Sequence, residues 1–316
     1  MSGKAPTEEE VLGYFKSLSN WGRWGEDDQL GSLNLITPDK TKRAAQLVRD
    51  GVTVTCAREI TYDASPDQPF PPLHYMVESG EGWSSGDKVS AFANSVSQDF
   101  FGLIFHGHSV THVDSLAHIF WEGKMYNGKP AHLVSTSLGA TVGSVDLAKD
   151  SFVTRGVLVD VPMIRGIDWV PLGEGVMAED IEAAEERCGF KVEEGDALLI
   201  RAGALKRRNV EGPVNPRVAG ATSPHASCLP LFHQRGISLM GSDTGNEVFP
   251  IPYPRVPLPI HQVSMVAMGL WLLDHANLEE LAQACQERGR WEFLFCMSPL
   301  RMSAGTGSPV NPVAIF

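Results

Sequence analysis

The sequence predicts an α/β or α+β protein built around a central mixed β-sheet. Short apolar, partly β-branched runs occur at 156–161 (GVLVDV), 197–201 (ALLIR) and 237–242 (ISLMGS). Such runs are typical of strands that are buried on both faces. An amphipathic helix is predicted between the first two runs, over residues 178–188, with Gly189 closing it. Strands that alternate with helices indicate a layered fold around one sheet.

The length and composition favour one large domain. The chain has 316 residues, of which 43% are hydrophobic and 20% charged. Chains of this size bury roughly three quarters of their unfolded surface, so a sizeable core is expected. We find no internal repeat. We expect an N-terminal helix and tryptophan-containing arm over residues 1–35, followed by a single domain over residues 36–316.

Capping signals delimit two helices near the N-terminus. Thr7 is a predicted N-cap, and Glu10 stands three residues later, as in a capping box. The second helix begins after Thr37, has Pro38 in its first turn and is predicted to end at Gly51. Both helices precede the predicted central strands.

The remaining elements follow the same logic. Residues 52–56 and 60–62 are predicted as short β-strands, and residues 64–72, with four prolines, as an extended loop. A long stretch compatible with a helix follows His261. A last helix is predicted from the Asn277 cap, with Glu280 completing its capping box, to Gly289.

The charge balance excludes some classes of partner. The chain carries 38 acidic and 26 basic residues, a formal net charge of −12, and its longest basic run is residues 206–208. Such a surface repels phosphate backbones, so we expect no nucleic-acid partner. The first residues lack the features of a signal peptide, and no apolar run approaches the roughly 18 residues that span a bilayer. We expect no membrane partner and a cytoplasmic protein.

The cysteines do not indicate a disulfide framework. They are odd in number, scattered and without a C-x-x-C pair: Cys56, Cys188, Cys228, Cys285 and Cys296. We interpret them as reduced thiols that mostly fill the core. A nucleophilic role stays open for Cys228, because it lies close to His225 in the sequence.

Histidines cluster in one part of the chain. Ten are present in all, and five of these fall between positions 106 and 132. The central stretch, residues 108–118, reads HSVTHVDSLAH. Side chains that can bind a metal thus stand at positions 108, 112, 114 and 118.

No straight element can bring these four side chains to one ion. On a helix, at about 100° per residue, His108 and His112 share a face but Asp114 points away from them. On a strand, His108 and His118 would lie about 33 Å apart at roughly 3.3 Å per residue. We therefore expect a strand that ends near His108, a turn through residues 109–111, and a new element after Asp114.

The ligand types indicate a transition metal. Imidazole and carboxylate together suit Zn²⁺, Mn²⁺ or Fe²⁺ better than Ca²⁺ or Mg²⁺. Three protein ligands leave an open position, where such an ion lowers the pKa of water from about 15.7 to about 7. We predict that His108, His112 and Asp114 bind one divalent ion per chain, Zn²⁺ or Mn²⁺, and that His118 transfers protons. The alternatives are histidines buried for packing, or a purely structural metal.

The same stretch resembles the metal motif of the cyclase-like metal hydrolase family, which includes bacterial kynurenine formamidases and isatin hydrolases. The motif is H-x-G-T-H-x-D-x-x-x-H, and here Val110 replaces its glycine while every ligand position is filled. The resemblance is to longer-chain members. It extends to residues 21–34 (WGRWGEDDQLGSLN), 125–128 (MYNG), 241–244 (GSDT) and 305–312 (GTGSPVNP).

This resemblance implies a swivelling β/β/α fold around the central sheet or barrel, and a homodimer or homotetramer. It also implies the ligand and proton-transfer roles given above. In two-metal relatives a later histidine and a glutamate hold a second ion, and His261 and Asp274 stand at the matching positions. Because Asp274 is one methylene shorter than glutamate, we expect one ion rather than two.

Further residues are candidates on the same grounds. His225 resembles an active-site residue that polarises the substrate carbonyl, the alternative being a histidine on a surface loop. Asp243 is expected to orient a ligand histidine. Trp21, Trp24 and Phe70 are expected in the substrate pocket, although the two tryptophans could equally cap the core or contact a second subunit.

We expect a metal-dependent hydrolase that cleaves a small, cyclic or aromatic amide, imide or formamide. A lactone or ester hydrolase of the dienelactone hydrolase type, using the same metal site, is the alternative. A serine hydrolase is disfavoured, because Thr111 stands where the G-x-S-x-G turn needs a glycine. A non-catalytic metal-binding relative also stays open, because Asp274 departs from the motif.

Overall fold

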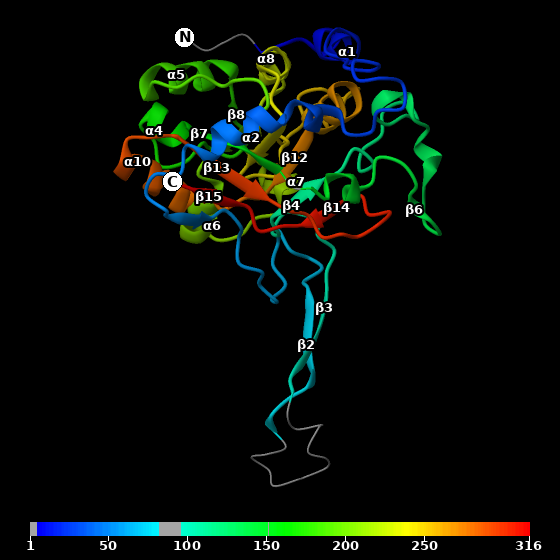
Figure 1. Ribbon diagram of the computed structural model, residues 1–316, viewed down its shortest axis with the longest axis vertical. Coiled ribbons are helices and arrows are strands. Elements are labelled where there is room, and N and C mark those ends of the chain that lie inside the picture. Colours follow the sequence, from blue (N-terminus) through cyan, green and yellow to red (C-terminus); the bar gives the residue numbers. More distant parts are fainter. Residues whose placement is uncertain (1–4, 82–95, 151) are drawn as a thin grey trace.

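A computed structural model of the chain describes residues 5–81, 96–150 and 152–316. Within this part, a sheet of nine strands in the order β1-β15-β13-β7-β9-β11-β12-β4-β14 forms the centre of the molecule and curls into a half-barrel (Figure 1). The predicted α/β class is thus confirmed. The strands of this sheet are β1 (Thr53–Thr55), β4 (His112–Asp114), β7 (Phe152–Asp160), β9 (Ala197–Arg201), β11 (Leu239–Ser242), β12 (Trp271–Asp274), β13 (Glu292–Met297), β14 (Gly307–Pro309) and β15 (Val313–Ile315).

The middle of the sheet is parallel and its flanks are antiparallel. β7, β9, β11 and β12 pair in parallel, whereas β13 joins β7, and β4 joins β12, in antiparallel register. Every residue of β9, β11 and β12 is buried. The three apolar runs predicted as strands therefore form the parallel centre, as expected for strands covered on both faces.

Helices surround this sheet. None of those in the described residues is both long and apolar enough to cross a bilayer. The α-helices are α1 (Glu8–Ser17), α2 (Pro38–Ala45), α4 (Val161–Arg165), α5 (Ala178–Cys188), α6 (Ala204–Glu211), α7 (Pro216–Ala219), α8 (Leu229–Arg235), α9 (Pro259–His261) and α10 (Glu279–Arg288).

The predicted caps are confirmed where they were clearest. The Thr7 hydroxyl accepts from the Glu10 amide at 3.3 Å, and Glu10 Oε2 accepts from the Thr7 amide at 2.6 Å, which is a complete capping box. Helix α5 covers the predicted residues and ends at Gly189, whose φ of 72° is left-handed. α10 ends at Gly289 in the same way. Its N-cap is Leu278 and not the predicted Asn277, whose side chain accepts from the Glu279 amide, and no capping box with Glu280 forms.

Two predictions for the N-terminal third were wrong. Helix α2 ends at Ala45 and not near Gly51, because the amides of Asp50 and Gly51 donate to the carbonyl of Phe316 and the chain turns toward its C-terminus. Residues 60–62 form no strand but an extended loop, in which the Thr61 carbonyl accepts from the Gln68 side chain at 2.8 Å.

The helix-compatible stretch after His261 is helical only as far as Met268. The chain forms a π-helix, η6 (Gln262–Met268), and leaves it at Gly269, whose φ is 65°. Residues 271–274 then form β12 between β11 and β4. A short apolar run fits a buried strand as well as a buried helix, so the periodicity could not distinguish them.

A two-stranded ribbon projects from the body. β2 (Leu73–Glu78) and β3 (Gln98–Gly102) pair in antiparallel register and extend away from the central sheet (Figure 1). The proline-rich loop predicted at residues 64–72 leads into this ribbon. Large apolar side chains such as Leu73 and Tyr75 are exposed along it.

The N-terminal arm lies on the π-helix and the turn after it. The Trp21 indole donates to the Val266 carbonyl at 2.6 Å, and the Asn20 amide donates to the Ala267 carbonyl at 2.9 Å. Gly31, with φ 58°, packs so closely that a Cβ there would lie 2.2 Å from the carbonyl oxygen of Gly269. The division of the chain at residue 35 stays a prediction.

Candidate metal centre

Strand β4 places His112 and Asp114 side by side. Residues two apart on a strand share a face, so both side chains point in one direction. β4 pairs with β12, which sets His112 opposite Asp274, and with β14 on its other side. All three residues of β4 are buried. The predicted bend is present, but the elements around it differ. No strand ends near His108, because a loop leads up to His112. The strand is formed by His112–Asp114 themselves and does not begin after Asp114.

Histidine nitrogens surround the Asp114 carboxylate. His106 Nδ1 lies 2.9 Å and His112 Nε2 3.5 Å from Oδ1. On the other side, His261 Nε2 lies 3.6 Å and His118 Nε2 3.9 Å from Oδ2. Both carboxylate oxygens are inaccessible to solvent and accept no hydrogen bond of acceptable geometry. Buried carboxylates are rarely left in this state, so the arrangement fits a site that a cation completes.

Two groups of ligand atoms have spacing suitable for a metal. His106, His112 and Asp114 form one group, and Asp114, His261 and Asp274 form the other, with the atoms of each group within 4.8 Å of one another. Asp114 belongs to both groups. Imidazole nitrogens with carboxylate oxygens suit a divalent transition metal. The shorter side chain of Asp274 still brings its Oδ2 within 3.7 Å of His261 Nε2.

Outer partners orient the second group. Glu247 Oε1 lies 2.9 Å from His261 Nδ1 and accepts from the His261 amide at 2.8 Å. The Asn246 side chain donates to Asp274 Oδ1 at 2.5 Å. A carboxylate on the far nitrogen of a histidine directs the other nitrogen toward a metal, which is the usual arrangement at protein metal sites.

The electrostatics of the cluster are shaped by burial and mutual contact. Burial alone would raise the pKa of Asp114, but His118 and His112 outweigh it and hold this pKa well below its usual range. Burial lowers the pKa of His118 to about 4, although Asp114 opposes the shift. His118 is therefore a neutral imidazole near pH 7, with its ring stacked on His106 at 3.8 Å between centroids.

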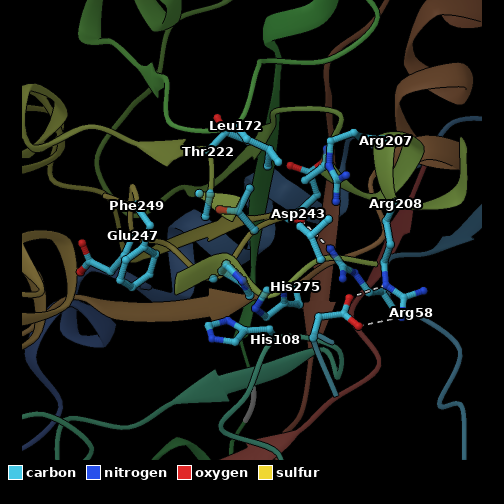
Figure 2. A pocket seen from close by; sticks show the side chains of 18 residues that line it. Arg58, His108, Leu172, Arg207, Arg208, Thr222, Asp243, Glu247, Phe249 and His275 are labelled. Carbon is cyan, nitrogen blue, oxygen red and sulfur yellow. Dashed lines mark hydrogen bonds and ion pairs between the residues drawn. The ribbon is translucent and has the colours of Figure 1, made fainter. Parts of the chain in front are cut away.

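His108 lies apart from both ligand groups. It lines a neighbouring cavity together with His275, and their ring centroids are 5.7 Å apart (Figure 2). His275 is buried with no hydrogen-bond partner on either ring nitrogen, and its ring lies 6.3 Å from that of His112. The role of His108 as a metal ligand stays a prediction, and the structure places His106 next to Asp114 instead.

His225 and Asp243 are both buried. The amide of Ser227 donates to His225 Nδ1 at 3.2 Å, and the Tyr253 hydroxyl lies 3.3 Å from Nε2. Burial lowers the pKa of His225. The Asp243 carboxylate accepts from the backbone amides of Ala202 and Ala204 at 2.7 and 2.8 Å, so its hydrogen bonds hold the start of α6.

The expected aromatic pocket residues lie in three places. Trp21, 40% exposed, lines a hollow with Phe15 and Trp121, separate from the cavity that contains His108. The Arg23 guanidinium lies 4.7 Å from the ring of Trp24. Phe70 is 70% exposed before the ribbon. Their part in substrate binding stays a prediction.

Cys228 is not placed as a nucleophile. Its thiol is buried and donates to the Val176 carbonyl at 3.3 Å. Burial raises the pKa of this thiol far above neutrality, so it carries no thiolate.

The structure adds residues that sequence reasoning missed. His106 belonged to the histidine-rich stretch, and His275 follows Asp274 directly, so both carried a weak signal. Glu247 and Arg58 carried none, because isolated charged residues in loops give no pattern. Glu247 is identified by its burial and its contact with His261, and Arg58 by its place in the cavity wall.

The comparisons with known proteins agree with this geometry. The family model described as "Putative cyclase" matches residues 44–246. A crystal structure described as a novel cyclase is 31% identical, with a TM-score of 0.86, and the alignment covers 95% of this chain and 100% of that chain. No curated protein sequence matched.

More distant structures share the fold. Isatin hydrolase A from Labrenzia aggregata, bound to benzyl benzoate, is 22% identical with a TM-score of 0.57, over 86% of this chain and 94% of that one. Isatin hydrolase A from Ralstonia solanacearum is 18% identical with a TM-score of 0.58, over 99% of both chains. Since the family model spans more than half of the chain and the novel cyclase aligns with nearly all of it, this protein belongs to the putative cyclase family.

Proposed function

We propose that this protein is a metal-dependent hydrolase that cleaves a small cyclic or aromatic amide, imide or formamide. The observation that carries the proposal is the buried Asp114 carboxylate, which lacks a hydrogen-bond donor of suitable geometry and is surrounded by histidine nitrogens. Solved structures with this fold include isatin hydrolases and a predicted metal-dependent hydrolase from Bacillus stearothermophilus. These names support a hydrolytic reaction for the same site.

His106, His112 and Asp114 would hold one divalent ion, Zn²⁺ or Mn²⁺. Such an ion supplies Lewis acidity, which activates water and polarises a carbonyl group. The proposal takes His106 in place of the sequence-predicted His108 because His106 Nδ1 is 2.9 Å from Asp114 Oδ1. His261 and Asp274 lie on the opposite side of Asp114, where they form the second group of ligand atoms with it.

His118 would move the proton. It is a neutral imidazole with 24% of its side chain exposed, and its Nε2 lies 3.9 Å from Asp114 Oδ2. A neutral imidazole next to the reaction centre accepts a proton from the attacking water and returns it to the leaving nitrogen. Its stacking on His106 fixes the ring plane.

Elemental analysis of the purified protein beside His112→Ala tests the proposal. We expect about one Zn or Mn per wild-type chain, and loss of both metal and hydrolysis in the variant. Both proteins are assayed on isatin, N-formylkynurenine and a simple lactone, which ranks the bond types. Metal-free protein with full activity would overturn the proposal, as would bound metal without turnover of any of the three.

A further inference from the structure

The cavity beside the metal centre has a wall of arginines. Arg58, Arg207 and Arg208 line it, and Figure 2 shows Arg58 and Arg208 on the right with His275 and His108 to their left. The cavity is open to solvent at its mouth, and the space within it and at the mouth amounts to about 540 Å³.

The acidic residues of this cavity already have partners. Asp67 forms an ion pair with Arg208, at 2.6 and 3.1 Å. The Asp243 carboxylate accepts two backbone amides, and Glu247 is held by His261. None of these carboxylates forms a hydrogen bond with the third cation, Arg58.

Within the part of the chain that the structure describes, Arg58 forms no ion pair, although the carboxylates of Asp243 and Asp67 lie close enough to favour its charge. Its Nη2 donates to the backbone carbonyl of Asp243 at 2.5 Å, and its Nε is inaccessible to solvent and has no acceptor. Its backbone amide is tied to the Thr111 hydroxyl at 2.8 Å, one residue before the metal-binding strand. Burial lowers the pKa of Arg58 to about 10, which leaves it charged near pH 7. The side chain is partly buried, and an Nε that is inaccessible to solvent and has no acceptor is satisfied when a ligand supplies one.

Arg207 adds to the positive charge of the wall. It is buried, and it reaches Glu211 only at 3.3 Å and the Gly212 carbonyl at 3.5 Å. The imidazoles of His108 and His275 line the cavity on the side of the Asp114 cluster, since the ring of His275 is 6.3 Å from that of His112. Gly245 leaves open the space where His275 Nε2 and His108 Nδ1 converge, at 2.8 and 3.2 Å from the position of a Cβ.

We propose that this cavity binds a carboxylate group of the substrate, that Arg58 is the residue that selects it, and that the protein acts on an anionic aromatic amide. The inference rests on the proposed function. A planar guanidinium pairs with a carboxylate through two parallel hydrogen bonds, which Lys cannot reproduce. The carboxylate would lie at Arg58, and the scissile carbonyl would then point past His275 toward His112 and Asp114.

A matched pair of substrates tests the selection. 2-Formamidobenzoate and formanilide share the same scissile formamide and differ by one carboxylate. The variants are Arg58→Gln, Arg58→Lys and a control, Arg43→Gln, which removes an exposed charge on α2. We expect the ratio of kcat/KM for the anionic to the neutral substrate to fall about 10- to 100-fold in R58Q, the usual worth of a charged hydrogen bond. The ratio should fall less in R58K, and it should keep its wild-type value in R43Q.

Binding provides a readout that does not depend on turnover. Calorimetric titration of the purified proteins with benzoate and with benzamide compares an anion with a neutral molecule of the same shape. We expect benzoate to bind more tightly than benzamide, and R58Q to lose this preference. If neither formamide is hydrolysed, the benzoate titration alone decides the inference, and the proposed function is decided separately by the assays on isatin, N-formylkynurenine and the lactone.

Two results would overturn it. One is an equal benzoate affinity in wild type and R58Q, and the other is an unchanged substrate ratio in R58Q. Circular dichroism establishes that R58Q is folded; if it is not, R58K replaces it, and an unchanged ratio and benzoate affinity in R58K would count against the proposal in the same way.

Discussion

The two halves of the histidine-rich segment behave differently. Residues 112–114 form β4, buried and hydrogen-bonded between β12 and β14. Residues 103–111, just before it, form a loop outside the sheet, where His106 and His108 turn to different surroundings. In the strand, the sheet register decides which way each side chain points. In the loop, only tertiary packing decides the direction of each side chain.

The position of His106 shows this dependence. Its Nε2 lies 3.1 Å from the Thr306 hydroxyl, 200 residues away in the chain, and its ring lies against Gly307 of β14. A Cβ at Gly307 would lie 2.7 Å from Cε1 of His106. The third ligand of the proposed site is therefore positioned by the C-terminal tail.

The largest effect is expected on the strand side of this comparison. Asp114→Asn keeps the shape of the side chain but removes the charge shared by both ligand groups. We expect loss of bound metal and a fall in activity greater than the roughly 10- to 100-fold that an outer partner costs. Elemental analysis and rates measure this, with Asp39→Asn on exposed α2 as the control. Retained metal in D114N would contradict the proposed site.

The loop side is tested by a pair of variants. His106→Ala should weaken metal affinity about 10- to 100-fold or more, because its Nδ1 faces Asp114. His108→Ala should keep the metal and mainly raise KM, because it lines the cavity. Metal titration and steady-state kinetics distinguish the two. The reverse outcome would show that the loop rearranges when the ion binds, in favour of the ligand predicted from the motif.

A smaller effect tests whether the tail positions the loop. Gly307→Ala would place a Cβ 2.6 Å from the Val113 carbonyl and against His106. We expect the free energy of unfolding to fall by about 1–3 kcal/mol, the usual cost of overpacking, together with weaker metal binding. Urea denaturation measures the first. Gly13→Ala in α1 is the control, since nothing lies within 4 Å of its Cβ position, and equal stability of the two variants would contradict the argument.

The smallest effect on activity is expected for the Cys228 thiol, which belongs neither to β4 nor to the loop before it. Cys228→Ala should keep activity within about twofold, because burial holds the thiol protonated at neutral pH. The raised pKa means that thiolate forms only as the pH rises well above neutrality, so iodoacetamide should react slowly up to pH 8. Rapid inactivation by this reagent, prevented in the variant, would restore the nucleophile hypothesis.

Local signals determined much of the fold. The Thr7 capping box, the glycine that ends α5 and the three apolar runs of the parallel sheet were all predicted from sequence and lie where expected. These features depend on hydrogen bonds and side-chain periods within about a dozen residues, which a single sequence contains. His112 and Asp114 were found for the same reason, since their spacing is local.

What joins distant segments was decided only by the tertiary structure. The chain after His261 forms a π-helix and then a strand, because residues 271–274 pair with β11 on one side and with β4 on the other. His106 reached Asp114 through contact with the tail, and Arg58 met His275 across a cavity whose walls lie up to about 200 residues apart in the sequence. No local sequence pattern predicts such long-range contacts. The free energy that stabilises them comes from burial and packing between elements that the sequence specifies separately.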